Sequence, residues 1–193
     1  MGSQWGYDKA YQRAKHEGYR SRAAYKFMEI QNKFSVIRRD DNVVDLGAAP
    51  GSWLQVIRTL TDARVMGIDL NPIAALDGVE TIVGDINDPE IRDEVLSMLG
   101  TVSVVVCDAA PKLSGHKSYD QARIIELNEQ ALAFACSVLK TGGNFVVKSF
   151  QGTDFPDFYT CVKEHFHSVK TMNTKSSRKG STELYVIAKN FFG

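Results

Sequence analysis

The sequence has little cysteine, no long apolar run and no net charge. Its three cysteines, Cys107, Cys136 and Cys161, are too few and too scattered for a disulfide framework or a CxxC metal site. No apolar run approaches the roughly 20 residues that cross a bilayer, and the first residues lack a signal-peptide profile. With 44% apolar and 24% charged residues, the 193-residue chain has the composition of a globular protein. We therefore expect a soluble, reduced, cytoplasmic monomer without metal or membrane segment, and the length favours a single domain over residues 1–193.

The zero net charge hides an uneven distribution along the chain. Residues 1–39 contain nine Lys or Arg against three Asp or Glu, and residues 163–193 contain six against two. The middle, residues 40–162, contains eight basic residues against eighteen acidic ones. Basic patches are typical of proteins that bind a polyanion, although solvated helix faces give the same count. The charge pattern therefore favours a nucleic-acid partner without establishing one.

From residue 42 onwards, short β-branched runs alternate with longer amphipathic stretches. This alternation is typical of an α/β fold with a mostly parallel sheet and helices on both faces. The expected strands are residues 43–46, 65–68, 81–83, 102–107, 144–148, 168–172 and 183–188. The expected helices are residues 52–61, 89–99, 119–139 and 155–165. Residues 1–39 are predicted to form a basic helical extension, broken near Gly18 and with Ser21 as a helix N-cap, before a core of residues 40–193.

Ionisable residues stand where the expected strands end. Asp45, Asp69, Asp85, Asp108 and Lys148 each come at or just after the end of a predicted strand. Open α/β sheets bind ligands beyond the carboxyl ends of their strands, near the point where the strand order reverses. Aspartate also favours strand exits and helix N-caps for structural reasons alone, but five ionisable residues on one edge indicate a functional site.

A turn of small residues follows the first expected strand, in the segment DLGAAPGSW over residues 45–53. Gly47 and Gly51 allow the backbone to approach a ligand closely. The turn is not the GxGxxG dinucleotide fingerprint, because Ala49 stands where the second glycine belongs, and no Gly-Lys-Ser/Thr of a P-loop follows. Asp45 before the turn disfavours a phosphate and suits a ligand with an ammonium or sulfonium group.

Two further carboxylates, Asp69 and Asp85, indicate the rest of the ligand. Asp69 stands where a carboxylate accepts hydrogen bonds from ribose hydroxyls, and Asp85 is placed to meet a base edge. An adenosine with a positively charged tail fits the set, and S-adenosylmethionine is the common cofactor of that description. The alternative is a nucleotide-free α/β domain with accidental turn glycines. The expected cofactor-binding residues are Asp45, Gly47, Ala48, Pro50, Gly51, Trp53, Asp69, Leu70, Asp85, Ile86 and Asp108.

Five ordered blocks give the chain a family resemblance over nearly its full length. They are SRAAYK at 21–26, DLGAAPGSW at 45–53, DAAPKLSG at 108–115, VKSFQG at 147–152 and SSRKGSTELY at 176–185. With them the chain resembles the FtsJ/RrmJ-type RNA ribose 2′-O-methyltransferases. The resemblance implies a Rossmann-like S-adenosylmethionine-dependent methyltransferase fold with a seven-stranded sheet. It also implies methylation of a ribose 2′-hydroxyl, with a uridine of large-subunit ribosomal RNA as the favoured target and ribosome maturation as the process.

The resemblance further implies a catalytic tetrad of Lys26, Asp108, Lys148 and Glu183. A ribose hydroxyl is a weak nucleophile, so a base has to take its proton as the new bond forms. We expect Lys148 to be that base and the two carboxylates to orient the lysine amines. Two exposed salt bridges, each worth little, are the alternative reading of the same four residues. Trp53 is expected to pack on the sheet, and Tyr25 either stacks on a base or belongs to the core.

Basic residues at both ends of the chain are candidates for phosphate contacts, which position RNA without choosing its sequence. They are Lys9, Arg13, Lys15, Arg20, Arg22, Arg38, Arg39, Lys112, Lys175, Arg178 and Lys179. Three other functions stay open: a transfer RNA anticodon-loop methyltransferase, a non-catalytic RNA-binding assembly factor and a small-molecule O-methyltransferase. The block DAAPK also departs from the DMAPN form of the bacterial family, which leaves the target nucleotide open.

Overall fold

The computed structural model describes residues 9–112, 114–177 and 180–193. Strands and helices alternate through the core, as the sequence pattern predicts. The strands are β1 (Val43–Leu46), β2 (Val65–Asp69), β3 (Val79–Val83), β4 (Val102–Cys107), β5 (Leu139–Phe150), β6 (Phe166–Met172) and β7 (Glu183–Phe191). The helices are α1 (Lys9–His16), α2 (Ala23–Phe34), α3 (Ser52–Leu60), α4 (Pro89–Leu99), α5 (Lys117–Val138) and α6 (Phe155–Lys163).

All seven strands form one sheet in the order β3-β2-β1-β4-β5-β7-β6. The pairs β3–β2, β2–β1, β1–β4 and β4–β5 are parallel, whereas β7 runs antiparallel to both β5 and β6. Val43 at the start of β1 lies between Val65 of β2 and Val104 of β4. The strand order therefore reverses between β1 and β4, and a ligand site is expected beyond their carboxyl ends. The predicted mostly parallel seven-stranded α/β sheet is confirmed.

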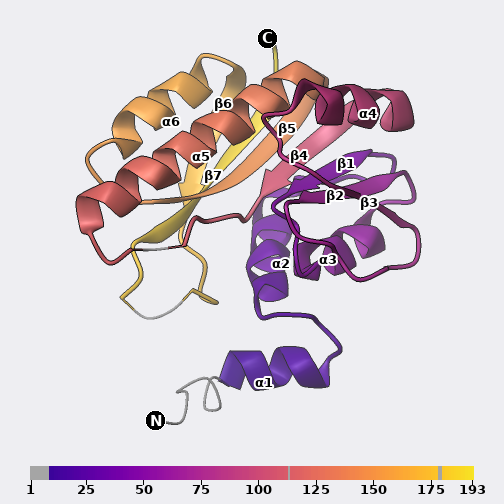
Figure 1. The fold of residues 1–193 in the computed structure, drawn as a ribbon, viewed down its shortest axis with the longest axis horizontal. Helices are drawn as coiled ribbons and strands as arrows, with labels where there is room; N and C mark the ends of the chain where they lie inside the picture. The colour runs from indigo at the N-terminus through magenta and orange to yellow at the C-terminus, as the bar shows by residue number, and fades with distance from the viewer. Residues whose placement is uncertain (1–8, 113, 178–179) are drawn as a thin grey trace.

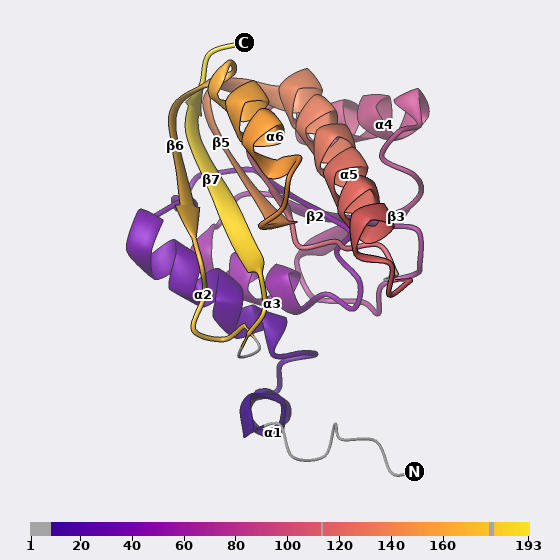
Figure 2. The same cartoon turned by 90° about the vertical axis from the view of Figure 1, so that its left-hand side faces the viewer.

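Helices cover both faces of the sheet (Figures 1 and 2). Helices α4, α5 and α6 pack on one face around a core that includes Val105 and Phe145. Helices α2 and α3 pack on the other face around a second core that includes Val104 and Tyr185. Every residue of β4 is buried, as expected for a central parallel strand covered on both sides. Helix α1 lies outside this sandwich, beyond α2 (Figure 1).

Helix α2 is part of this packing although it belongs to the basic N-terminal segment. The Phe27 ring lies 4.7 Å from the Trp53 ring, measured between centroids, and the Trp53 indole donates to the Ala23 carbonyl at 2.9 Å. Trp53 is only 3% exposed, which agrees with the expected structural role. The helix begins one residue later than a Ser21 cap would require, because Arg22 holds the cap position. The Ser21 hydroxyl instead accepts a bond from the Ala23 amide at 3.2 Å.

The largest differences from the predicted strand boundaries are at the start of β5 and the end of β7. Strand β5 begins at Leu139, whereas the prediction places its start at residue 144. The additional first part contains Gly142 in a left-handed conformation and pairs with β4 in an irregular register. Glycines weaken the β-pattern on which the prediction rests. Strand β7 continues to Phe191, where the side chain packs on Phe166 of β6 at 5.3 Å between ring centroids. Within the described ranges, no helix combines the length and the apolarity that crossing a membrane requires.

Candidate active site

A cavity of about 580 Å³ opens at the carboxyl ends of β1, β2, β3 and β4. A smaller cavity of about 120 Å³ adjoins it and shares Gly47, Ala49 and Asp108 with it. The larger volume lies in the range of small-molecule sites. The two cavities occupy the reversal point of the strand order, where the sheet topology places a ligand.

The small-residue turn after β1 forms the floor between the two cavities. Gly47 has a φ of +66°, and a Cβ atom added there would lie 2.4 Å from the Ala109 Cβ. Only glycine therefore fits at this position without moving the loop after β4. Gly51 has a φ of +101° and packs against the Arg20 guanidinium, but it lines neither cavity. All other expected cofactor residues line at least one of the two cavities.

Asp69 and Asp85 lie on the rim of the larger cavity in two equivalent turns. One oxygen of Asp69 accepts from the Asn71 amide at 2.8 Å, and the other accepts from the Ala49 amide at 3.0 Å. Oδ1 of Asp85 accepts from the backbone and the side chain of Asn87, both at 2.9 Å. These bonds fix the two carboxylates at the ends of β2 and β3 in defined orientations toward the cavity that they line.

Asp45 is buried in β1 beside the smaller cavity. Its Oδ2 atom has no hydrogen-bond partner among the described residues. Burial, together with the negative charges of Asp108 and Asp69, holds the pKa of this carboxyl well above its ordinary value. A buried carboxyl without a partner is costly, and a cationic or hydrogen-bond-donating ligand would relieve that cost.

Helix α2 and strand β7 bring Lys26 and Glu183 together across 157 positions in the sequence. The Lys26 Nζ donates to both Glu183 oxygens, at 2.7 and 2.8 Å, and the two side chains are 9% and 11% exposed. The Ser177 hydroxyl donates to Glu183 Oε1 at 2.6 Å. Burial alone would raise the pKa of Glu183, but the bonds from Lys26 and Ser177 outweigh it and lower that pKa.

The other two tetrad residues meet at the ends of β4 and β5. The Lys148 Nζ lies 3.2 Å from Asp108 Oδ1 and also donates to the Asp108 carbonyl. The Tyr185 hydroxyl donates to the same carboxylate oxygen at 2.7 Å. Since Lys148 pairs with Tyr185 in the sheet register, both side chains lie on one face of the sheet. Asp108 is thus held by two neighbours and also lines both cavities.

Tyr185 connects the two pairs. Lys26 Nζ lies 5.9 Å from the centre of the Tyr185 ring, whose hydroxyl contacts Asp108. Burial and the charges of Asp108 and Glu183 raise the pKa of the Tyr185 hydroxyl well above its ordinary value, so it stays a proton donor. The four expected catalytic residues therefore form one cluster of buried lysines and half-buried carboxylates, not two exposed salt bridges.

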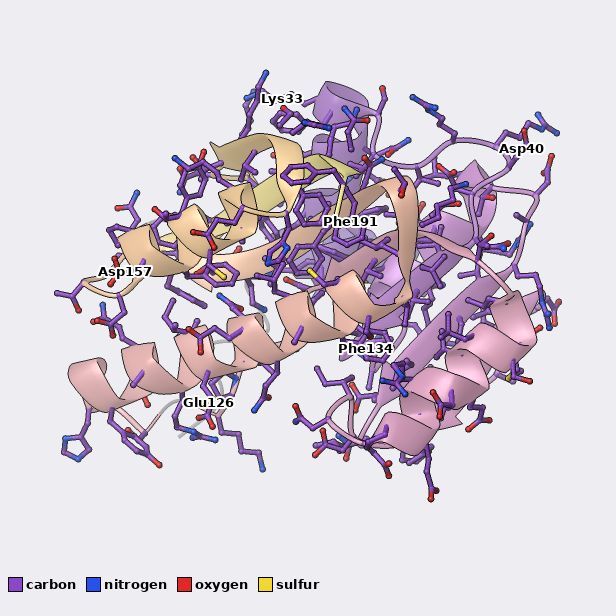
Figure 3. The ribbon with its side chains drawn as sticks, turned by 90° about the horizontal axis from the view of Figure 1, so that it is seen from above. Lys33, Asp40, Glu126, Phe134, Asp157 and Phe191 are labelled. Atoms are coloured by element: carbon purple, nitrogen blue, oxygen red, sulfur yellow. The ribbon has the colours of Figure 1, made fainter. Side chains whose placement is uncertain are left out.

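Several residues of the site were missed by sequence reasoning. A stripe of α5 lines the larger cavity with Arg123, Glu126, Leu127 and Gln130, at helical spacing. Figure 3 looks down on α5, with Glu126 in its first half and the buried Phe134 in its second. The polar residues at helical spacing in an otherwise core-facing helix are the sequence signal from which this face could have been predicted. Tyr185 and Ser177 stand inside quoted blocks, but their partners emerge only in the fold.

The basic residues predicted to contact phosphates separate into groups. The Arg20 guanidinium donates to the carbonyls of Pro50 and Ala75, at 2.9 and 2.8 Å, and so braces the cofactor turn. Arg39 pairs with Asp62 before β1 begins, at the sheet edge opposite the cavities, and Arg38 adjoins it. Arg178, Lys179 and the side chain of Lys9 lie outside the described residues.

Tyr25 bridges the two N-terminal helices rather than entering the core. Its hydroxyl donates to Glu17 at 2.8 Å, and the Arg13 guanidinium lies 4.9 Å from its ring centre. Cys107 behaves as expected for a buried thiol, since burial raises its pKa to about 12. Within the described ranges, no cluster of three or more His, Cys, Asp or Glu side chains is arranged to hold a metal ion.

Known proteins share this architecture and this sequence pattern. The family described as FtsJ-like methyltransferase matches residues 19–191. The chain belongs to the FtsJ-like methyltransferase family. A protein of Methanoregula boonei named ribosomal RNA large subunit methyltransferase E is 69% identical over the full length of both chains. A protein of the same name from Methanosphaerula palustris is 62% identical and is covered to 95%.

A solved structure shares the fold of this FtsJ-like chain closely. It is that of a Plasmodium falciparum protein described as a candidate ribosomal RNA methyltransferase. The two superpose with a TM-score of 0.82 at 29% identity, over 91% of this chain and all of the other. Together with the matches at higher identity, this likeness makes the chain an RNA methyltransferase by family.

Proposed function

We propose that this protein transfers a methyl group from S-adenosylmethionine to a ribose 2′-hydroxyl of large-subunit ribosomal RNA, most specifically that of a uridine. The cluster of Lys26, Asp108, Lys148 and Glu183 beside a cofactor-sized cavity is the observation that carries this proposal. The names of the relatives from Methanoregula boonei and Methanosphaerula palustris support the choice of RNA. The resemblance to ribose methyltransferases supports the choice of oxygen.

The residues around the two cavities fit S-adenosylmethionine. The unpartnered Oδ2 of Asp45 and the charge of Asp108 suit a cationic tail, and the cavity shared by Asp69 and Asp85 suits an adenosine. Gly47 leaves no room for a side chain where the turn closes on Ala109. When bound, this cofactor supplies an electrophilic methyl group. We propose Asp45, Gly47, Ala48, Pro50, Trp53, Asp69, Leu70, Asp85, Ile86 and Asp108 as its contacts, whereas Gly51 shapes the turn without lining the cavity.

Lys148 is the proposed general base. Its Nζ would accept the proton of the ribose hydroxyl as that oxygen takes the methyl group, while the S–CH3 bond of the bound sulfonium would break and leave a neutral thioether. Asp108, held by Tyr185, fixes the position of that amine through the 3.2 Å contact and the bond to its own carbonyl. Orientation of this kind contributes to the rate because the reacting atoms start in line.

Lys26 and Glu183 are proposed to position the ribose. Tyr185 lies between this pair and the pair of Lys148 and Asp108. Lys26 reaches into the cluster, where Glu183 holds its amine by two bonds. Because Lys26 belongs to α2, the N-terminal segment contributes directly to the reaction centre. We therefore propose that residues 1–39 and 40–193 act as one methyltransferase domain, with the basic extension serving both catalysis and RNA contact.

The test is methyl transfer by Lys148 variants. We expect Lys148→Ala to lower the transfer of tritiated methyl to large-subunit ribosomal RNA by about 10²–10⁴-fold, the usual contribution of a general base. Lys148→Arg keeps the charge but cannot lose its proton, so it should be equally inactive. Lys140→Ala, on the exposed start of the same strand, is the matched control. Cofactor affinity, measured by calorimetry, should stay unchanged in all three variants. Full activity of Lys148→Ala would refute the assignment.

The position of the methylated ribose identifies the RNA substrate. Ribose methylation mapped across total RNA, with and without the gene, should show one site that depends on this protein in large-subunit ribosomal RNA. A dependent site in a transfer RNA anticodon loop instead would replace the substrate and leave the reaction unchanged.

A further inference from the structure

A third cavity lies at the C-terminal end of α2, apart from the two cavities of the candidate active site. Its volume is about 340 Å³, and it is enclosed by the last turn of α2 and by strands β6 and β7. Three lysines line it, Lys33, Lys170 and Lys189, together with Phe34, Ser168 and Asn190. Three cationic side chains from three separate elements thus converge on one hollow.

Within the part of the chain that the structure describes, no carboxylate forms an ion pair with these lysines. No acidic side chain lines the cavity, and among the described residues none of the three lysines forms an ion pair. Glu29, one helical turn before Lys33, accepts bonds from the Ser176 and Lys175 amides instead. Asp40, which follows α2, lies well apart from Lys33 (Figure 3). Converging cations without a counter-charge favour an anionic ligand.

The strands connect this cavity to the reaction centre on a single face. Alternate residues of a strand share one face, so Glu183 and Lys189 of β7 lie on the same side of the sheet. In the register of β6 and β7, Ser168 lies opposite Lys189 and Lys170 lies opposite Ile187. Directly opposed residues also share a face. The basic cavity and Glu183 therefore lie on the same face of the sheet, at either end of the stretch of β7 that is buried in the α2 core.

Helix α2 makes the same connection on its side of the interface. Lys26, Ile30 and Lys33 fall at positions i, i+4 and i+7, which form one stripe of a helix. At 1.5 Å per residue, Lys33 lies about 10 Å along the axis from Lys26. The stripe thus begins at the Lys26–Glu183 pair, crosses the buried Ile30 and ends at the cavity.

We propose that the cavity of Lys33, Lys170 and Lys189 binds backbone phosphates of the RNA substrate, beyond the nucleotide that is methylated. This inference rests on the proposed RNA methylation and adds a second contact point to it. Lys189 is pre-positioned, because its Nζ donates to the Phe34 carbonyl at 2.9 Å. A lysine on an edge strand also discourages strand pairing, which would account for Lys170 alone. It does not account for a helix residue and a residue of β7 that converge on the same cavity.

The test compares two charge-matched double variants. Lys33→Gln with Lys170→Gln removes two positive charges from the cavity and spares Lys189, which bonds to the end of α2. Lys140→Gln with Lys163→Gln removes two exposed positive charges elsewhere and is the control. Binding of in vitro transcribed large-subunit ribosomal RNA is measured from low to moderate salt. Melting temperature and S-adenosylmethionine affinity verify that each variant is folded.

For the cavity variant we expect RNA affinity to fall at least about fivefold and the salt slope to decrease by about 1.4, as for two lost contacts to single-stranded RNA. The control should bind RNA as the wild type does. An unchanged affinity and slope in the cavity variant would overturn the inference, as would an equal loss in both pairs, which would be an effect of net charge. If the wild type transfers no methyl to RNA but the cavity variant still loses affinity, the proposed reaction fails and the phosphate site stands.

Discussion

The buried Lys26–Glu183 pair offers the sharpest energetic prediction. Both side chains are about one-tenth exposed, and the amine contacts both carboxylate oxygens within 2.8 Å. Replacing Glu183 with Gln leaves the Lys26 ammonium buried without its counter-charge. Loss of one partner of such a pair costs about 3–5 kcal/mol of unfolding free energy. The Tyr185 ring, 5.9 Å from the amine, retains a weak cation–π contact of about 0.5–1 kcal/mol.

We therefore expect Glu183→Gln to lower the unfolding free energy by about 2–4 kcal/mol. For a chain of this size that corresponds to a melting temperature lower by roughly 5–15 °C. Lys26→Met removes the amine and keeps an apolar side chain. The double variant, Lys26→Met with Glu183→Gln, therefore contains no unpaired amine. The coupling in the double-mutant cycle, measured by urea unfolding, should reach about 1.5–3 kcal/mol. Additivity within about 0.5 kcal/mol would refute the reasoning.

The pH dependence of this difference provides a second test on the same proteins. The pKa of Glu183 is lowered by its bonds from Lys26 and Ser177, against the opposing effect of burial. A carboxyl with a lowered pKa in the folded state stabilises the fold above its unfolded value, about 4.3 for glutamate. The difference in unfolding free energy between the wild type and Glu183→Gln should stay constant from about pH 8 to pH 5. It should shrink only as the pH falls through the lowered pKa, and a gap that shrinks near neutral pH would contradict the assignment.

Two further predictions concern buried groups near the cofactor cavity. Because burial and the charges of Asp108 and Asp69 raise the pKa of Asp45, its ionisation destabilises the fold above its unfolded value of about 3.9. Asp45→Asn should accordingly raise the unfolding free energy by about 1 kcal/mol at neutral pH, and this gain in stability should disappear below about pH 4. In calorimetry the same variant should bind S-adenosylmethionine more weakly. Burial raises the pKa of Cys107 to about 12, so alkylation of the native protein at pH 8, followed by mass spectrometry, should leave this thiol unmodified, whereas rapid labelling would show that the strand opens.

The sequence predicts those parts of the fold whose signal is local. The valines of β4 indicate a buried parallel strand, and the aspartates at or near the ends of β1, β2 and β3 indicate the carboxyl edge of the sheet; the structure has both there. The start of β5 could not be predicted, because Gly142 and Gly143 remove the β-branched pattern before the strand proper.

Contacts between distant segments are the other part that the sequence leaves open. Arg20 reads as a phosphate ligand, yet its guanidinium holds the carbonyls of Pro50 and Ala75, 30 and 55 positions away. Tyr185 and Ser177 gain their partners only when β7 pairs with β5 and the loop before it folds back. Charge and spacing therefore name candidate residues, while tertiary packing decides which of them share a task.

The unbalanced charges explain how one neutral chain can hold two ligands of opposite charge. Asp45 of β1 and Asp108, which follows β4, place two carboxyl groups beside one cavity, where a bound cation would be stabilised. Lys33 and Lys170 place positive charge in the cavity at the C-terminal end of α2. Each group costs stability in the free protein, which is typical of functional sites. Since α2 also carries Lys26, a single helix connects the proposed phosphate cavity to the amine that is proposed to position the ribose.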